Sequence, residues 1–230
     1  VLVNGIMVRK PGKKIDNSLD IYLKKEFPYV GRGGLKLEAA LEKFSISVKG
    51  KVCADIGASI GGFTDCLLKH GASRVYAIDI AEDLLHPSLR CEKMKNRVIL
   101  LLGFDARELN SLGEKVDICT IDVTFASLRV ILPNVKKFLK MNGEIVALVK
   151  PLFETEYYKE KKFGVIQDSK VLIKLLIELM DWCVDEKFFP YGIIKSPLLG
   201  KGGSIEFLVY FKIDNTNFYL DYKNTIRDIL

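Results

Sequence analysis

Long apolar runs are scarce in this chain of 230 residues. Stretches such as Val98–Leu102 have only the length of a β-strand, and none approaches the roughly 18 residues that a membrane-spanning helix requires. No signal peptide is readable at the start. The chain begins at Val1, without a methionine and inside a strand-like pattern, so we expect a further segment upstream. The sequence therefore predicts no transmembrane segment.

Cysteine and histidine are too few and too scattered to predict a metal site or a disulfide framework. No C-x-x-C pair occurs, and His70 and His86 lack the spacing of metal ligands. We therefore expect free thiols in a reducing compartment, no bound metal and a cytoplasmic location. The cysteines are Cys53, Cys66, Cys91, Cys119 and Cys183.

Positive charge is in modest excess. Lys and Arg number 35 against 29 Asp and Glu, which gives a formal net charge of +6. This excess favours an anionic partner such as nucleic acid, but it does not separate nucleic acid from a membrane surface. Because 49% of the residues are hydrophobic, we also expect a packed core.

The first residues differ in pattern from the rest of the chain. Asn4 and Gly5 lie between two apolar triplets, which is a strong signal for a β-hairpin, and a basic turn and a short strand follow. We interpret residues 1–24 as a fragment of a small β-rich module. Residues 25–50 are interpreted as a linker and a helix, because apolar residues recur there at i, i+3, i+4 and i+7. These residues are Leu37, Ala40, Leu41 and Phe44.

Strand and helix patterns alternate from residue 51 to the C-terminus. This alternation predicts an α/β fold, with a mostly parallel seven-stranded sheet and helices on both faces, as in Rossmann-like domains. We assign residues 51–230 to this domain. Strands are expected at 52–56, 75–80, 98–102, 116–121, 145–149, 188–194 and 205–212. Helices are expected at 61–70, 82–90, 127–140 and 169–184, and a charged, aromatic loop at 155–163.

A glycine-rich turn follows the first strand of this domain. It runs from Asp55 to Phe63 and opens a helix, and its glycines let the backbone approach a ligand closely. Asp79 ends the next strand, where a carboxylate can bind the ribose hydroxyls of a nucleoside. Asp105 follows the third strand and is expected near an adenine edge. The alternative is a glycine-rich turn without a ligand, and the two acidic residues disfavour it.

The spacing of this turn indicates which nucleoside cofactor it suits. The pattern is D-x-G-x-x-x-G-G, whereas dinucleotide sites have G-x-G-x-x-G. A carboxylate at position 55 opposes a pyrophosphate but suits a cationic sulfonium and an amino group. The sequence therefore favours S-adenosylmethionine over NAD. The expected binding residues are Asp55, Gly57, Ala58, Ser59, Gly61, Gly62, Phe63, Asp79, Ile80, Asp105, Ala106 and Asp122.

Four charged residues stand at predicted element ends or within apolar strands. Lys36 begins the first helix, Asp122 and Lys150 end two strands, and Glu206 lies in the last strand. Ligands of open α/β sheets bind beyond the carboxyl ends of the strands, so Asp122 and Lys150 are expected at the mouth that holds the cofactor. The alternative is a structural network of ion pairs, because an unpaired buried ion is costly. The combination of all four with the cofactor turn favours catalysis.

Three segments together resemble the TlyA / hemolysin A family, which is similar to the FtsJ-type RNA ribose methyltransferases. These segments are Tyr29–Leu37, Asp55–Asp65 and Leu148–Glu154, and the resemblance spans almost the whole chain. It implies a Rossmann-like methyltransferase domain whose Lys-Asp-Lys-Glu tetrad falls on Lys36, Asp122, Lys150 and Glu206. It also implies an N-terminal S4-type RNA-binding domain, of which residues 1–24 would be the C-terminal remnant. The chain departs from the usual family residues at Ile60, Leu152 and Ser204.

The resemblance implies an rRNA (cytidine-2'-O)-methyltransferase that uses S-adenosylmethionine and acts on ribosomal RNA or ribosomal subunits. Lys150 would contact the ribose hydroxyl, Asp122 would hold Lys150, and Lys36 and Glu206 would position the hydroxyl. Candidates for phosphate contacts, each otherwise a solvated surface charge, are Arg9, Lys10, Lys13, Lys14, Arg32 and Lys201.

Three other functions stay open at this point. The first is a membrane-active cytolysin, as the hemolysin name suggests, although no strong basic amphipathic helix is present. The second is a non-catalytic ribosome-assembly factor that binds RNA and keeps the cofactor. The third is an NAD-linked enzyme. The sequence does not indicate an oligomeric state.

Overall fold

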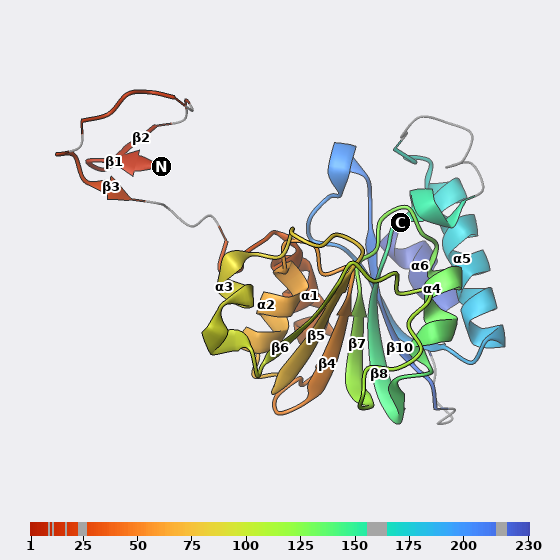
Figure 1. Ribbon diagram of the computed structural model, residues 1–230. Helices are drawn as coiled ribbons and strands as arrows, with labels where there is room; N and C mark the ends of the chain where they lie inside the picture. Colours follow the sequence, from red (N-terminus) through yellow and green to blue (C-terminus); the bar gives the residue numbers. More distant parts are fainter. Residues whose placement is uncertain (9, 11, 17, 23–26, 156–164, 215–219) are drawn as a thin grey trace.

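A seven-stranded sheet forms the centre of the molecule (Figure 1). The computed structural model describes residues 1–230 except 9, 11, 17, 23–26, 156–164 and 215–219. The strand order is β6-β5-β4-β7-β8-β10-β9; β10 runs antiparallel to both β8 and β9, whereas the other neighbouring strands of this sheet run parallel. This confirms the predicted Rossmann-like α/β fold. The strands are β4 Val52–Ile56, β5 Arg74–Asp79, β6 Val98–Leu102, β7 Val116–Ile121, β8 Leu139–Val149, β9 Phe189–Lys195 and β10 Phe207–Lys212.

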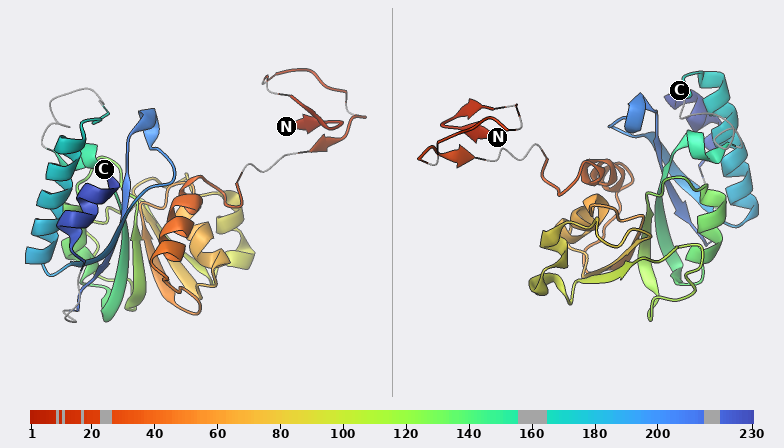
Figure 2. Two further views of the ribbon diagram at one scale, coloured as in Figure 1. Left: turned by 180° about the vertical axis from the view of Figure 1, so that it is seen from behind. Right: turned by 45° about the horizontal axis from the view of Figure 1, so that its top comes forward.

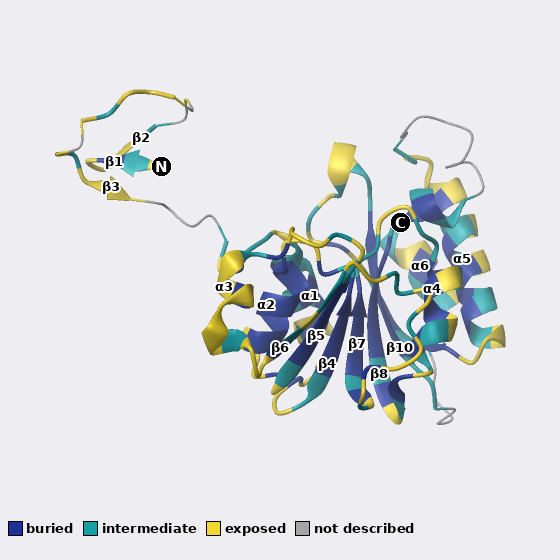
Figure 3. Ribbon diagram, in the orientation of Figure 1, coloured by how far each residue is buried: buried dark blue, intermediate teal, exposed yellow. Residues whose placement is uncertain are grey.

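Helices cover both faces of this sheet (Figure 2). One face carries α1 Gly33–Lys43, α2 Gly62–Lys69 and α3 Pro87–Arg90, and the other carries α4 Leu128–Val135, α5 Ser169–Asp185 and α6 Tyr222–Ile229. Successive residues of a strand point to opposite faces, so Cys53 belongs to the first core and Ala54 to the second. The central strands are accordingly buried along most of their length (Figure 3). Continuous apolar strands such as β7 are what a sheet buried on both faces requires.

The first residues form a separate three-stranded sheet. Its strands are β1 Leu2–Val3, β2 Ile6–Met7 and β3 Ile21–Tyr22, in the order β2-β1-β3. Asn4 and Gly5 both have positive φ, at 47° and 78°, as a two-residue hairpin turn of this hand requires. The predicted hairpin is therefore confirmed. The division of the chain at residues 24 and 50 stays a prediction.

Two predicted helices are wrong in extent. The helix expected at 82–90 is only α3, because Pro87 occupies its first turn and the side chain of His86 caps it by accepting from Ser88 N–H. The helix expected at 127–140 ends at Val135, because the chain then turns into β8, and Val116 N–H donates to Phe138 O. The apolar pair Phe138 and Leu139 fits helical and strand periods equally well.

Two further features bear on the predictions. Helix α6 was not predicted, since Ile226 is its one fully buried apolar residue. The loop expected at 155–163 lies, apart from Thr155, outside the described residues. Within the described part of the chain, no helix is long and apolar enough to cross a membrane.

Candidate active site

A cavity of about 710 Å³ opens at the carboxyl ends of the central strands. Its walls come from the turn after β4, the start of α1, the ends of β7 and β8, and the hairpin between β9 and β10. This is the place where open α/β sheets bind their ligands. A cavity of this size is typical of sites for small molecules and cofactors.

The turn after β4 is packed so tightly that it needs glycine. Gly57 has a φ of +81°, and a Cβ atom there would lie 2.4 Å from the carbonyl oxygen of Asp122. The amides of Gly57 and Ala58 both donate to Ile78 O, at 2.9 and 3.1 Å. The turn is thereby fixed against the ends of β5 and β7, and the cavity is lined by its residues Gly57, Ala58, Ser59, Ile60, Gly62 and Phe63.

Asp55 lies beneath this turn and not in the cavity. Its side chain is fully buried and accepts from Thr64 Oγ1 at 2.6 Å and from Thr120 Oγ1 at 3.0 Å. Burial raises the pKa of this carboxyl to about 7, although both threonine hydroxyls oppose the shift. The expected direct approach of Asp55 to a cationic ligand therefore differs from the observed geometry. Asp55 instead joins β4, β7 and α2 below the turn.

The two acidic residues expected near a nucleoside are already bound by protein donors. Asp79 accepts from Ser59 N–H at 2.7 Å and from Ala81 N–H at 2.8 Å. Asp105 accepts from Nε and Nη2 of the Arg107 guanidinium, and this guanidinium holds the pKa of Asp105 below its usual value. Neither residue is among the cavity-lining residues of the described chain, nor are the expected Gly61, Ile80 and Ala106. Asp79 nevertheless lies at the edge of the turn through Ser59.

Two ion pairs bring the four charged residues to one cavity. Lys36 Nζ lies 2.5 Å from Glu206 Oε2, and Lys150 Nζ lies 2.6 Å from Asp122 Oδ1. All four residues line the cavity, although they come from distant parts of the chain. The side chains of Lys36 and Glu206 are only 12% and 6% exposed, so water screens this pair weakly. The structure thus joins the four residues as two lysine–carboxylate pairs.

Lys150 has three acceptors around its amino group. Besides Asp122, its Nζ donates to Val123 O at 2.9 Å and to Thr124 Oγ1 at 3.1 Å. A protonated lysine has three N–H donors and no acceptor, so this environment uses every donor. The arrangement therefore suits an ammonium ion that the protein holds in place, and an N–H group becomes available to a ligand oxygen when one of these three contacts is exchanged. The sequence alone does not single out Thr124, because a lone threonine after a strand carries no pattern.

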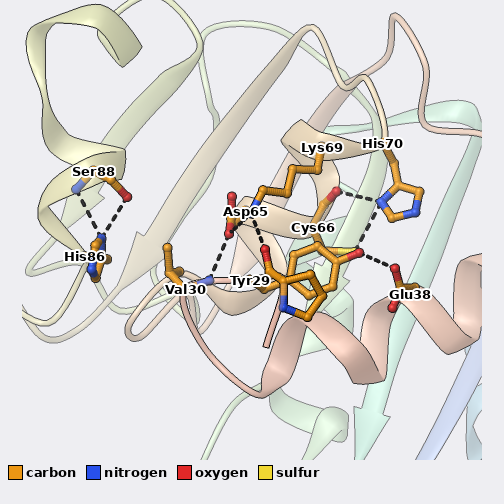
Figure 4. A network of polar contacts seen from close by, with 10 residues as sticks. Tyr29, Val30, Glu38, Asp65, Cys66, Lys69, His70, His86 and Ser88 are labelled. Carbon is orange, nitrogen blue, oxygen red and sulfur yellow. Dashed lines mark hydrogen bonds and ion pairs between the residues drawn. The ribbon is translucent and has the colours of Figure 1, made fainter. Parts of the chain in front are cut away.

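Lys36 is placed by a close contact between α1 and α2. A Cβ atom on Gly62 would lie 3.0 Å from Gly34 N and 3.2 Å from Gly33 Cα, so the two helix starts meet backbone to backbone. Figure 4 shows the polar contacts that hold the chain just before α1. Tyr29 Oη donates to Glu38 Oε1 at 2.5 Å, and Val30 N–H donates to Asp65 Oδ2 at 2.9 Å. These contacts anchor the start of the Tyr29–Leu37 segment to α1 and α2.

The predicted phosphate-binding residues fall into two groups. Arg32 and Lys201 are exposed and line the cavity. Lys10, Lys13 and Lys14 are exposed in the N-terminal module. Arg9 lies outside the described residues. No cluster of His, Cys, Asp or Glu that could hold a metal occurs in the part of the chain that the structure describes.

Comparison with known proteins places this site in a family. The model of the FtsJ-like methyltransferase family matches residues 29–213. The chain belongs to the FtsJ-like methyltransferase family. The matched region contains the cavity and both ion pairs. It begins at Tyr29, one of the residues whose polar contacts Figure 4 shows.

Relatives of this FtsJ-like chain include proteins named as hemolysins and proteins named as rRNA methyltransferases. Hemolysin A of Brachyspira hyodysenteriae is 39% identical over 93% of this chain and 89% of its own length. The 16S/23S rRNA (cytidine-2'-O)-methyltransferase TlyA of Mycobacterium tuberculosis (strain CDC 1551 / Oshkosh) is 33% identical over 92% of this chain and 80% of its own. A solved structure of a candidate hemolysin from Streptococcus thermophilus is 37% identical, with a TM-score of 0.84 over 99% of this chain and 84% of that one.

A more distant solved structure shares this fold. The N-methyltransferase NodS from Bradyrhizobium japonicum WM9, solved with S-adenosyl-L-homocysteine, is 16% identical and has a TM-score of 0.53 over 76% of this chain and 85% of its own. At this identity the likeness shows the fold alone.

Proposed function

We propose that this protein transfers a methyl group from S-adenosylmethionine to a ribose 2'-hydroxyl of ribosomal RNA. The observation that carries the proposal is the convergence of two lysine–carboxylate pairs, Lys36–Glu206 and Lys150–Asp122, on one cavity beside the glycine-rich turn. Membership of the FtsJ-like family and the similarity to TlyA support the same reaction.

The turn after β4 fits this cofactor. Gly57 can have no side chain where it meets Asp122, and the backbone of the turn consequently forms the cavity wall itself. Gly57, Ala58, Ser59, Gly62 and Phe63 would hold the cofactor, with Asp79 at the rim. When bound, S-adenosylmethionine supplies the electrophilic methyl group. The cavity is also large enough to admit part of a nucleotide beside it.

The chain's own residues would orient the hydroxyl. The Lys150 ammonium would exchange one of its protein acceptors for the ribose oxygen and stabilise the negative charge that grows there as the hydroxyl loses its proton to water. Asp122 holds Lys150 in place, and Lys36 with Glu206, which line the same cavity, would position the ribose. Orientation of this kind contributes much of the rate of a bimolecular transfer.

Contacts to the RNA backbone would come from exposed basic residues. Arg32 and Lys201 stand at the cavity, where they can bind phosphates next to the target nucleotide. Residues 1–24, interpreted as part of an S4-type module, would supply Lys10, Lys13 and Lys14. Ribosomal RNA as the substrate also implies that the protein acts in the cytoplasm.

Tritiated methyl transfer to isolated ribosomal subunits tests the proposal. We expect incorporation with the wild-type protein and a loss of about 100-fold or more with Lys150→Ala, because an oriented charged donor is removed. Lys174→Ala is a matched control, since Lys174 is an exposed, ion-paired lysine on α5. S-adenosylmethionine should raise the Tm of both variants. Full transfer by Lys150→Ala would exclude the assigned role of this residue.

A further inference from the structure

Glu154 stands just behind the wall of the cavity, and the proposed methyl transfer does not use it. It is the last residue of η2 Pro151–Glu154, the short 3₁₀ helix that follows Lys150. Its neighbours Pro151, Leu152 and Phe153 line the cavity, whereas Glu154 does not. A carboxylate in this position needs partners, since burial raises its pKa above the usual value.

The partners of Glu154 lie at the start of α4. Its Oε2 accepts from Ser127 Oγ at 2.6 Å, and its Oε1 accepts from Leu128 N–H at 2.9 Å. The first amides of a helix have no partner within the helix, and a carboxylate there also interacts favourably with the helix dipole. Glu154 therefore caps a helix from 26 residues further along the chain.

Two contacts nearer the cavity join the same two segments. Lys150 contacts Asp122, and the rings of Phe153 and Phe125 lie 5.4 Å apart. Together with the Glu154–Ser127 bond, these contacts hold the segments 122–128 and 150–154 side by side. Phe125 has a φ of +66°, a conformation that costs a non-glycine residue energy and persists only where its surroundings hold it. The Glu154 bonds fix the far end of this segment.

We propose that Glu154 is a positioning residue of this site: it braces the 122–128 segment so that Asp122, Val123 and Thr124 keep their acceptors around Lys150. This inference rests on the proposed function. Glu154 acts through other residues and touches no reactant. Its loss should let the three acceptors of Lys150 move apart, and so should change the reactivity of the Lys150 amine itself.

Two variants separate the hydrogen bonds of Glu154 from the volume of its side chain. Glu154→Met keeps most of the side-chain volume and removes both acceptor oxygens, whereas Glu154→Gln keeps one acceptor for Leu128 N–H. Ser127→Ala removes the hydroxyl half of the brace, together with the cap that Ser127 Oγ provides to Arg129 N–H, and carries the test if Glu154→Met does not fold. The matched control is Asp168→Ala, because Asp168 caps α5 through Lys170 N–H and Val171 N–H in the same way, away from the cavity.

The first measurement is the acylation rate of Lys150 with an N-hydroxysuccinimide ester, followed by mass spectrometry. Acylation proceeds through the neutral, unbound amine. We expect Lys150 to react about 3 to 10 times faster in Glu154→Met and less so in Glu154→Gln, with Lys36 as the internal reference. An unchanged Lys150 rate in folded Glu154→Met, or the same increase in Asp168→Ala, would overturn the proposal.

The second measurement is steady-state methyl transfer. Misplaced acceptors should lower kcat about tenfold in Glu154→Met, with partial rescue in Glu154→Gln and KM for RNA within about twofold. A purely structural cap would instead lower the Tm of both Glu154→Met and Asp168→Ala and leave kcat unchanged, which would contradict the proposal. Absence of transfer by the wild-type protein would refute the proposed function, whereas the acylation result would still decide the brace.

Discussion

A single atom determines why residue 200 is glycine. A Cβ atom there would lie 2.1 Å from Glu206 Oε1 and 2.4 Å from Ser204 Oγ, although the φ of −72° suits any residue. Gly200→Ala must therefore shift the Glu206 carboxylate, whose other oxygen pairs with Lys36. We expect methyl transfer to fall on the order of 100-fold while the Tm changes by only a few degrees, because the strain falls on the site and not on the core. Wild-type transfer by this variant would show that the Lys36–Glu206 pair is dispensable.

Asp55 makes the stability of the fold depend on pH. Its pKa is raised from 3.8 to about 7 by burial, so the folded state favours the neutral carboxyl. The stabilisation is complete below the unfolded pKa and is lost as the pH rises through the folded pKa. We therefore expect the free energy of unfolding to fall by a few kcal/mol as the pH rises from about 4 to about 8.

Urea unfolding of the wild-type protein and of Asp55→Asn across this pH range checks this prediction. The asparagine cannot ionise, and it can still bond Thr64 and Thr120 in the fully buried site. The free energy of unfolding of Asp55→Asn should accordingly vary much less with pH than that of the wild-type protein. Parallel pH profiles of the two proteins would assign the titration to other groups.

The sequence indicated where the charged residues lie but not what they face. Asp122 and Lys150 could be placed at one edge because they end strands of a parallel sheet. The burial of Asp55 could not be foreseen, since Thr120 is 65 residues away and joins it only in the folded sheet. Asp105 likewise meets Arg107, a contact that a strand-end pattern does not reveal.

Among the elements, the contact between α1 and α2 is the one that most directly positions the site. Gly62→Ala would bring a methyl group to 3.0 Å from Gly34 N and 3.2 Å from Gly33 Cα, all backbone atoms that yield only if the helices separate. Lys36, one turn into α1, would then move away from Glu206. We expect a loss of about tenfold in kcat and a lower Tm, measured by transfer assays and calorimetry. An unaltered kcat with a lowered Tm would confine this contact to a structural role.

Element boundaries were predictable where apolar strands were flanked by glycine or charge. The predicted β4, β6 and β7 agree with the structure residue for residue. Helix α3 was predicted too long, because the sequence period does not show that residues 81–86 pack irregularly beneath the turn, with Leu85 buried. Helix α6 was not predicted because its apolar stripe is narrow. The stripe is recognisable only in the fold, where it packs against α5 and β9.

On the scale of the whole molecule, the proposed cofactor site and the proposed RNA-binding lysines belong to two separate sheets. The cavity lies at the seven-stranded sheet, whereas the connection between β2 and β3 of the three-stranded sheet carries exposed lysines, and residues 1–24 contribute no cavity-lining residue among those described. Substrate binding and cofactor binding should therefore be separable by substitution. A substitution in the three-stranded sheet should affect RNA affinity and leave the cofactor unaffected.

This division can be tested by replacing three lysines with glutamine, namely Lys10, Lys13 and Lys14. Each phosphate contact that is lost reduces by one the number of counterions released on RNA binding. The slope of the logarithm of the RNA-binding constant against the logarithm of the salt concentration should therefore become shallower by about one unit per contact. We expect weaker RNA binding at low salt, a convergence with the wild-type protein at high salt, and an unchanged Kd for S-adenosylmethionine. The matched control replaces three exposed lysines of the large domain, Lys170, Lys174 and Lys187. An equal change of slope in this control would mean that net charge alone, and not the N-terminal module, attracts the RNA.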